Sequence, residues 1–158
     1  MEPQKTNKDV MTSDFSTIKA DANLKEAFTG IKKMLEKSPH SPGLIVIENE
    51  GNYAGVLTLA DFMNELRKLY RDACDKTGGK EWMASLFTEC EIMGMRKVYE
   101  ITSGKRLSIK SGDSFEKACE LILHKKLDLL AVVDEKSMPV GVITRRHVLT
   151  EIGSRIFK

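Results

Sequence analysis

The sequence predicts a mixed α/β fold (α+β) in which one compact unit occurs twice. The first observation is a repeated motif, because Gly-Val-Leu-Thr at 55–58 returns as Gly-Val-Ile-Thr at 141–144, 86 residues later. The second is a short apolar run ahead of each copy, at 44–47 and at 130–133. A helical pattern further upstream recurs at a spacing of 91, which implies a five-residue insertion within 37–43. A long period seen only twice indicates a duplicated body, and function is to be sought in the cleft between its halves.

The first copy is predicted to contain a strand, a helix, two strands and a second helix. Leu24, Ala27 and Ile31 recur at helical spacing and mark the buried face of the first helix. Prolines and a glycine follow that pattern and end the helix. A short polar turn joins the next two strands, so we expect them to be antiparallel. The expected elements are an extended segment at 15–19, a helix from Leu24, strands at 44–47 and 53–57, and a helix from Thr58.

The second copy is predicted to repeat this order, which gives tandem strand-helix-strand-strand-helix units packed with pseudo-two-fold symmetry. Between the copies lies a connector that has no counterpart elsewhere in the chain. It contains a helical piece over 80–90 that is rich in aromatic residues and methionine, a pattern typical of core or dimer contacts. The expected elements of the second copy are an extended segment at 107–110, a helix at 114–126, strands at 129–134 and 138–143, and a helix at 144–156.

The chain length of 158 residues corresponds to about one domain, and each half is short for a core of its own. We therefore expect the two halves to share a core. The predicted organisation is a polar N-terminal tail at 1–8, a first repeat at 9–70, a helical connector at 71–98 and a second repeat at 99–158.

Composition narrows the classes of protein that fit. The net charge of +2 comes without a basic block, so nucleic-acid binding is not expected, and Lys125-Lys126 is interpreted as a solvated helix end. No apolar stretch is long enough to span a membrane. The three cysteines lack metal-site spacing and indicate free thiols in a reducing compartment, with Cys119 as a core residue. These features favour a cytoplasmic protein that does not bind membranes.

Thr58 and Asp61 support two interpretations. The structural one is a helix N-cap with a reciprocal carboxylate partner. The functional one uses the same geometry, since a helix N-terminus favours an anion such as phosphate and the Thr58 hydroxyl can donate to it. In that interpretation Gly55 permits close approach of backbone or ligand, and the Asp61 carboxylate accepts hydrogen bonds from the two hydroxyls of a ribose. The residues alone leave both interpretations open.

The repeated unit that ends in Gly-hydrophobic-hydrophobic-Thr-x-x-Asp resembles the CBS domain family, and a tandem pair of such domains is called a Bateman module. The resemblance covers about 9–70 and 99–158. Asp9-Val10-Met11-Thr12 is similar to the opening segment of the family, and Glu100-Ile101-Thr102 is a looser version of it.

The resemblance implies an adenosyl ligand (AMP, ADP, ATP or S-adenosylmethionine) in clefts that combine the Thr/Asp motif of one repeat with the opening segment and first core strand of the other. Two clefts are expected, called A and B here. Cleft A would use Thr58, Asp61, Thr102, Leu107, Leu127, Asp128 and Leu129. Cleft B would use Thr12, Ser16, Ser41, Pro42, Gly43, Thr144, Arg145 and His147.

Two residues depart from the family pattern. His147 stands where the ribose-binding carboxylate is expected in cleft B, so that cleft is predicted to favour phosphate, more strongly as His147 gains a proton between about pH 8 and pH 6. Of the adjacent Arg145 and Arg146, one is expected to face solvent. Asp128 in cleft A places a negative charge near the path expected for a long phosphate tail. Cleft A is the better predicted nucleotide site.

These features predict a regulatory module that binds an adenosyl nucleotide and signals to an effector protein. No combination of nucleophile, base and oxyanion donor is evident, so an enzyme is not expected, and neither a metal nor a required cofactor is predicted. The resemblance and the apolar helix faces predict a homodimer. The alternative is a structural or interaction protein that dimerises or docks through the same fold without any ligand.

Overall fold

The computed structural model describes residues 4–37, 42–102 and 107–157. The predicted strands and longer helices are confirmed. Most of their boundaries differ from the prediction by no more than two residues. Two helices of one turn each, α1 and α5, were not expected. The elements are α1 (Asn7–Val10), β1 (Thr17–Lys19), α2 (Leu24–Lys37), β2 (Gly43–Ile47), β3 (Tyr53–Thr58), α3 (Leu59–Thr77), α4 (Trp82–Met93), α5 (Val98–Ile101), β4 (Ser108–Lys110), α6 (Phe115–Lys125), β5 (Leu129–Val133), β6 (Pro139–Thr144) and α7 (Arg145–Ile156).

Each repeat forms a three-stranded sheet with the same topology. In the first sheet β1 is parallel to β2 and β2 is antiparallel to β3, and β4, β5 and β6 repeat this arrangement. A shift in register recurs as well, between Val46 and Ile47 in the first sheet and between Val132 and Val133 in the second. The duplication seen in the sequence is therefore a duplication of backbone geometry.

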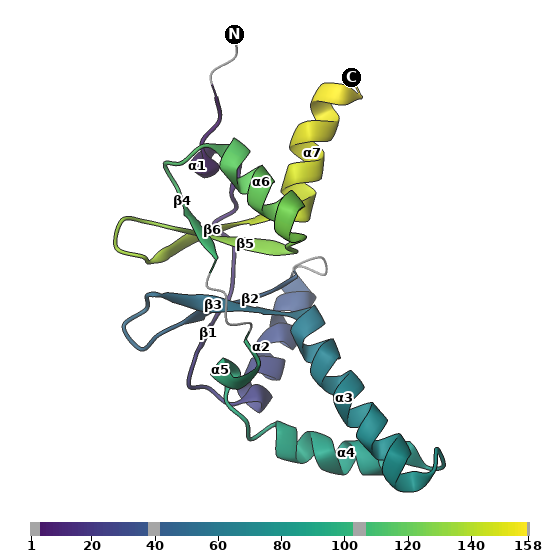
Figure 1. Cartoon of the computed structure of the whole chain (residues 1–158). Coiled ribbons are helices and arrows are strands. Elements are labelled where there is room, and N and C mark those ends of the chain that lie inside the picture. Colours follow the sequence, from purple (N-terminus) through teal and green to yellow (C-terminus); the bar gives the residue numbers. More distant parts are fainter. Residues whose placement is uncertain (1–3, 38–41, 103–106, 158) are drawn as a thin grey trace.

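The two sheets lie against each other in the middle of the molecule, and helices cover their outer sides (Figure 1). Successive side chains of β2 point to opposite faces of the sheet, as in any β-strand. Leu44 and Val46 pack with α2, whereas Ile45 faces the other sheet. Burial on both faces explains why this strand is a continuous apolar run. The residues shared between the sheets are Ile45, Tyr53, Leu129, Ala131, Val133 and Val142.

The opening helices of the two repeats are exchanged. The backbone N–H of Asn7 in α1 donates to the carbonyl of Asp113 in the second repeat at 2.9 Å. The N–H of Val98 in α5 donates to the carbonyl of Ala22 in the first repeat at 2.8 Å. Asn7 and Val98 are both fully buried. The core of each repeat is thus completed by the opening helix of the other repeat.

A glycine at the same place in each motif makes room for the exchanged segment. A Cβ atom at Gly55 would lie 2.8 Å from the Cγ2 of Thr102, just after α5. At Gly141 it would lie 2.5 Å from the Sδ of Met11 and 3.0 Å from the carbonyl oxygen of Thr12, just after α1. The expected close approach at Gly55 is therefore that of another part of the chain.

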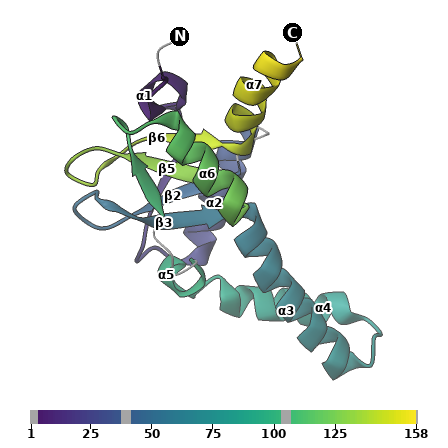
Figure 2. The same ribbon diagram turned by 45° about the horizontal axis from the view of Figure 1, so that its top comes forward.

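The helix α3, which begins in the first repeat and runs into the connector, forms a helical hairpin with α4 that extends from the body (Figure 2). The rings of Tyr70 on α3 and Trp82 on α4 meet edge to face, with centroids 4.9 Å apart. An ion pair joins Lys76 to Glu89 at 2.7 Å. Among the residues described, α4 has no fully buried one, so the apolar side chains of this helix remain partly exposed.

Candidate ligand-binding clefts

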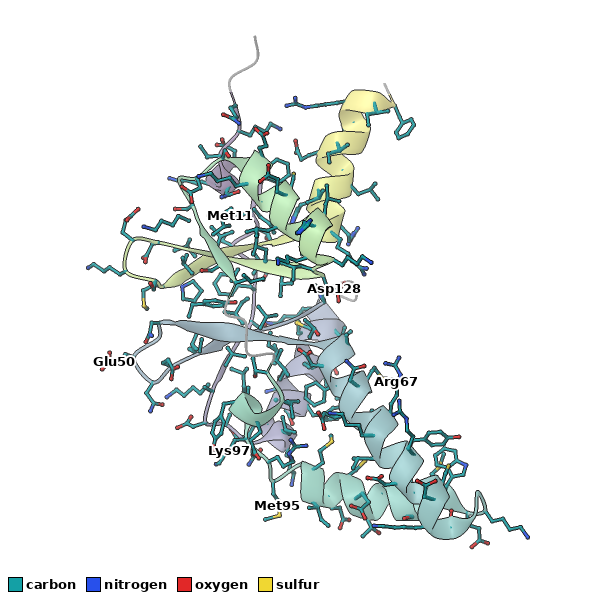
Figure 3. The ribbon with its side chains drawn as sticks, in the orientation of Figure 1. Met11, Glu50, Arg67, Met95, Lys97 and Asp128 are labelled. Atoms are coloured by element: carbon teal, nitrogen blue, oxygen red, sulfur yellow. The ribbon has the colours of Figure 1, made fainter. Side chains whose placement is uncertain are left out.

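Cleft A has a volume of about 490 Å³ and is built from both repeats. One wall comes from β3 and the first turn of α3. The other comes from Leu107 and from the segment that joins α6 to β5, near the labelled Asp128 in Figure 3. The lining residues are Tyr53, Val56, Thr58, Asp61, Leu107, Lys125, Lys126, Leu127, Asp128 and Leu129.

The Thr58–Asp61 pair forms a reciprocal cap at the start of α3. The backbone N–H of Thr58 donates to the Oδ2 of Asp61 at 2.8 Å, and the N–H of Asp61 donates to the Oγ1 of Thr58 at 3.1 Å. The structural interpretation of these residues is confirmed. It does not exclude the functional one, because both side chains also line cleft A and the Thr58 hydroxyl, an acceptor in the cap, keeps its own hydrogen to donate.

Asp128 carries an ion pair that the sequence did not predict. The Nε of Arg145 lies 3.1 Å from the Oδ1 of Asp128, and the backbone N–H of Arg145 donates to the Asp128 carbonyl at 3.3 Å. Arg145, assigned to cleft B from the sequence, is not among the residues that line that cleft. As the first residue of α7 its side chain extends to the wall of cleft A, whereas Arg146 lines cleft B.

Cleft B has a volume of about 410 Å³. It combines the region around α1 with Pro42, the end of β6 and the first turns of α7. Its walls carry three carboxylates, Asp9, Asp14 and Glu151, against the single guanidinium of Arg146. This balance of charge opposes the expected preference for phosphate. The lining residues are Asp9, Val10, Thr12, Asp14, Pro42, Val142, Thr144, Arg146, His147, Thr150 and Glu151.

His147 takes the place of Asp61 in the cap of the second repeat. Its Nδ1 accepts a hydrogen bond from the backbone N–H of Thr144 at 2.9 Å, which requires that nitrogen to be unprotonated. Burial first and the nearby charge of Arg146 second lower the pKa of His147 from its usual value, with Glu151 acting in the opposite direction. The charged ring expected between pH 8 and pH 6 is therefore disfavoured, and its role as a phosphate donor is not supported.

The CBS domain model matches the sequence twice, over residues 8–68 and 98–154, the same two segments that form the two sheets and clefts. The chain belongs to the CBS domain family. No curated protein matches the sequence at a significant level.

Solved CBS domain structures share this fold. CBSX2 in complex with AMP is 24% identical, with a TM-score of 0.62, and the match covers 97% of this chain and 98% of that one. A CBS domain-containing protein of unknown function from Bacillus anthracis is 21% identical, with a TM-score of 0.71 and coverage of 96% and 95%. The cytosolic domain of the Mg2+ channel MgtE in complex with ATP is 19% identical, with a TM-score of 0.65. That match covers 90% of this chain but 46% of the MgtE chain, so this chain spans about half of its length.

The CBS clefts contain most, but not all, of the residues named from the sequence. Thr102 donates its hydroxyl to the carbonyl of Val98 at 2.7 Å and is not among the lining residues of cleft A. Ser16 accepts from the N–H of Ile45 through its carbonyl, and Gly43 begins β2, so neither lines cleft B as described. Ser41 lies outside the described residues.

Two groups of cleft A residues were missed from the sequence. Tyr53 and Val56 lie on β3, and the Tyr53 hydroxyl donates to the carbonyl of Leu107 across the cleft at 2.8 Å. Lys125 and Lys126, interpreted as a solvated helix end, are exposed but line the cleft. Lys126 ends α6 in the left-handed conformation, φ 54°, which directs the chain straight into the far wall. A lysine pair placed just before a cleft strand was the available signal.

The described residues contain no cluster of three or more histidine, cysteine or acidic residues suited to a metal ion. The three cysteines are free and half-buried, and burial raises the pKa of the Cys119 and Cys90 thiols. Cys119, expected to be a core residue, is half-buried and packs against the edge of the second core. None of the described helices combines the length and apolarity needed to cross a membrane.

Proposed function

We propose that this CBS pair is a regulatory module that binds an adenosyl nucleotide in cleft A and passes the bound state to a partner protein. The observation that carries the proposal is the composition of cleft A. A hydroxyl and a carboxylate from one repeat face apolar residues and two lysines from the other, within a volume of about 490 Å³.

Each part of a nucleotide has a complementary group in this cleft. The Asp61 carboxylate is suited to accept hydrogen bonds from a ribose diol. Tyr53, Val56 and Leu127 supply an aromatic and apolar surface for a purine. The ammonium groups of Lys125 and Lys126 suit phosphate. The complexes of CBSX2 with AMP and of MgtE with ATP support nucleotide as the ligand class.

Cleft A is a better candidate than cleft B because of charge. The two lysines of cleft A balance its two carboxylates, whereas in cleft B three carboxylates outnumber one arginine. We propose that the protein acts by binding a ligand rather than by catalysis, and that it does so in the cytoplasm. The one histidine among the residues that line these clefts, His147, uses its Nδ1 to cap α7.

A thermal-shift series with AMP, ADP, ATP and S-adenosylmethionine tests the proposal. Ligand at 100 times its dissociation constant should add about 2.7 kcal/mol to the free energy of unfolding. Inorganic phosphate at the same ionic strength is the control for nonspecific charge effects. Absence of a shift with all four ligands would favour the alternative, a ligand-free interaction protein that docks through exposed apolar residues such as Met83 and Phe87.

A further inference from the structure

Arg145 lies at the junction of the two clefts. It is the first residue of α7, and it lies between two residues that line cleft B, the N-cap residue Thr144 and His147 in the first turn of the helix. Its guanidinium, however, pairs with Asp128, a residue of cleft A, at 3.1 Å. One side chain therefore connects the helix that begins at cleft B to the wall of cleft A.

The duplicated repeat shows that this ion pair is not needed for the fold. At the equivalent place in the first repeat, 86 residues earlier, the backbone N–H of Leu59 donates to the carbonyl of Pro42 at 3.0 Å. The same backbone bond joins Arg145 to Asp128 at 3.3 Å. The first repeat keeps this bond with two uncharged side chains, so the charged pair is an addition specific to cleft A.

The pair is exposed enough to exchange partners. The Arg145 side chain is 72% exposed and that of Asp128 30%. Exposed ion pairs contribute little to stability because water screens them and both side chains lose freedom. A phosphate group offers a guanidinium two or more oxygens and a larger charge than one carboxylate does. Arg145 can therefore turn to a phosphate at small cost.

The charges of cleft A favour phosphate near this pair. With a ribose on Asp61, the phosphates would be repelled by that carboxylate and attracted to Lys125 and Lys126, which lie close to Asp128 in the chain. Without Arg145, the carboxylate of Asp128 would repel them. With it, that charge is compensated, and one further cation stands at the edge of the cleft.

We propose that Arg145 is a specificity-determining residue of cleft A, which neutralises Asp128 and binds the phosphates of the ligand. The affinity of the cleft then rises with the number of phosphates. This inference rests on the proposed function, since it concerns the same ligand class and the same cleft.

Calorimetric titration of adenosine, AMP and ATP into the full chain tests the inference. Arg145→Gln should weaken ATP by about tenfold or more and AMP by less, and it should leave adenosine unchanged. Asp128→Asn removes the repelling carboxylate and frees Arg145, so it should strengthen ATP severalfold. Glu135→Gln is the matched control and should change none of the three, because it breaks an exposed pair of 3.1 Å between Glu135 on the β5–β6 turn and Lys110 at the end of β4.

The outcomes separate this inference from the proposed function. Loss of the adenosine signal in Asp61→Ala assigns the binding to cleft A. Equal weakening of adenosine and ATP by Arg145→Gln, or no weakening of either, would overturn the role of Arg145 while nucleotide binding stands. If the unmodified protein binds no nucleotide, both proposals fall. Circular dichroism of both variants should show an unchanged thermal midpoint, because the first repeat folds without the pair.

Discussion

In the first turn of α7 the imidazole Nδ1 of His147 accepts a hydrogen bond from the backbone N–H of Thr144 at 2.9 Å. In the first repeat the Asp61 carboxylate holds the N–H of Thr58 in the same way at 2.8 Å. A carboxyl group keeps an acceptor oxygen in either protonation state, whereas an imidazole can fill this role only while Nδ1 carries no proton. The two caps therefore differ in how they respond to acid.

We predict that the His147 cap weakens as the pH falls. Because the pKa of His147 is lowered in the folded protein, the unfolded chain binds more protons between the folded pKa and 6.5. The stability contributed by the neutral ring is complete above about pH 6.5 and is lost as the pH falls through the folded pKa. Urea denaturation at pH 7.5 and 5.5 measures this. His147→Asn, which accepts without titrating, should lose less stability between the two pH values, whereas the control His124→Gln should behave like the unmodified protein.

We predict that Asp61→Ala weakens binding of AMP by about tenfold or more, because a charge-assisted hydrogen bond contributes about 1.5–3 kcal/mol. It should also cost up to about 1 kcal/mol of stability through the lost cap. Asp61→Asn separates the two effects, since its amide oxygen still accepts from the Thr58 N–H but carries no charge. Calorimetry and thermal melts on both variants decide. Unchanged affinity combined with a lower melting temperature would mean that Asp61 only caps α3.

We predict that Gly141→Ala destabilises the protein by about 1–3 kcal/mol, because its Cβ would meet the exchanged segment. The side chain of Met11 can move, but the carbonyl of Thr12 at 3.0 Å cannot. Adding Met11→Ala should therefore restore only part of the loss. Gly112→Ala, where a Cβ has no neighbour within 4 Å, is the matched control in the same repeat. Equal effects at Gly112 and Gly141 in denaturant titrations would refute this explanation.

We predict that Tyr70→Ala destabilises the α3–α4 hairpin by about 0.5–1.5 kcal/mol through loss of the edge-to-face contact with Trp82. Trp82 is the single tryptophan of the chain, so its fluorescence reports the hairpin directly. The emission spectrum should shift in the variant, and urea unfolding followed by fluorescence should occur at lower urea. Tyr99→Ala, at a side chain 62% exposed on α5, should leave the Trp82 spectrum as it is.

We predict a homodimer in solution, on the grounds of the apolar helix faces. On α4, Met83 and Phe87 are 51% and 62% exposed one helical turn apart. Light scattering at tens of micromolar should give twice the monomer mass. If α4 extends the interface, Phe87→Glu should lower that mass, whereas Thr88→Glu on the next position should have a smaller effect. A monomer at every concentration would exclude the dimer.

The strands could be predicted because the residues of each strand show its burial directly. Leu44–Ile47 and Leu130–Val133 are apolar at every position, since each strand has one face on helices and the other on the opposite sheet. The one-turn helices α1 and α5 have no comparable pattern in the sequence. Four residues show no periodicity, and the burial of Asn7 and Val98 depends on partners far away in the sequence.

The residues of the candidate site could be predicted where a sequence motif identifies them. They could not be predicted where the rotation of a helix determines which residue faces the cleft. Thr58, Asp61 and the residues just before β5 follow from the repeat and the resemblance. Which of Arg145 and Arg146 faces cleft B depends on the rotation of α7, and the buried Val148 sets that rotation by packing in the core. Adjacent helix residues point apart, so the sequence could limit the choice to one of the two but could not make it.

The exchange of α1 and α5 determines how this chain can fold. The bond from Asn7 to Asp113 closes a loop of more than a hundred residues, so the second core is incomplete until almost the whole chain has been placed. Such non-local contacts slow folding and leave neither repeat as an independent folding unit. The turn at Gly78-Gly79, where an added Cβ would meet nothing, is the natural place to divide the chain. Each resulting fragment would hold the helix that completes the other, so the two fragments should acquire structure only by associating.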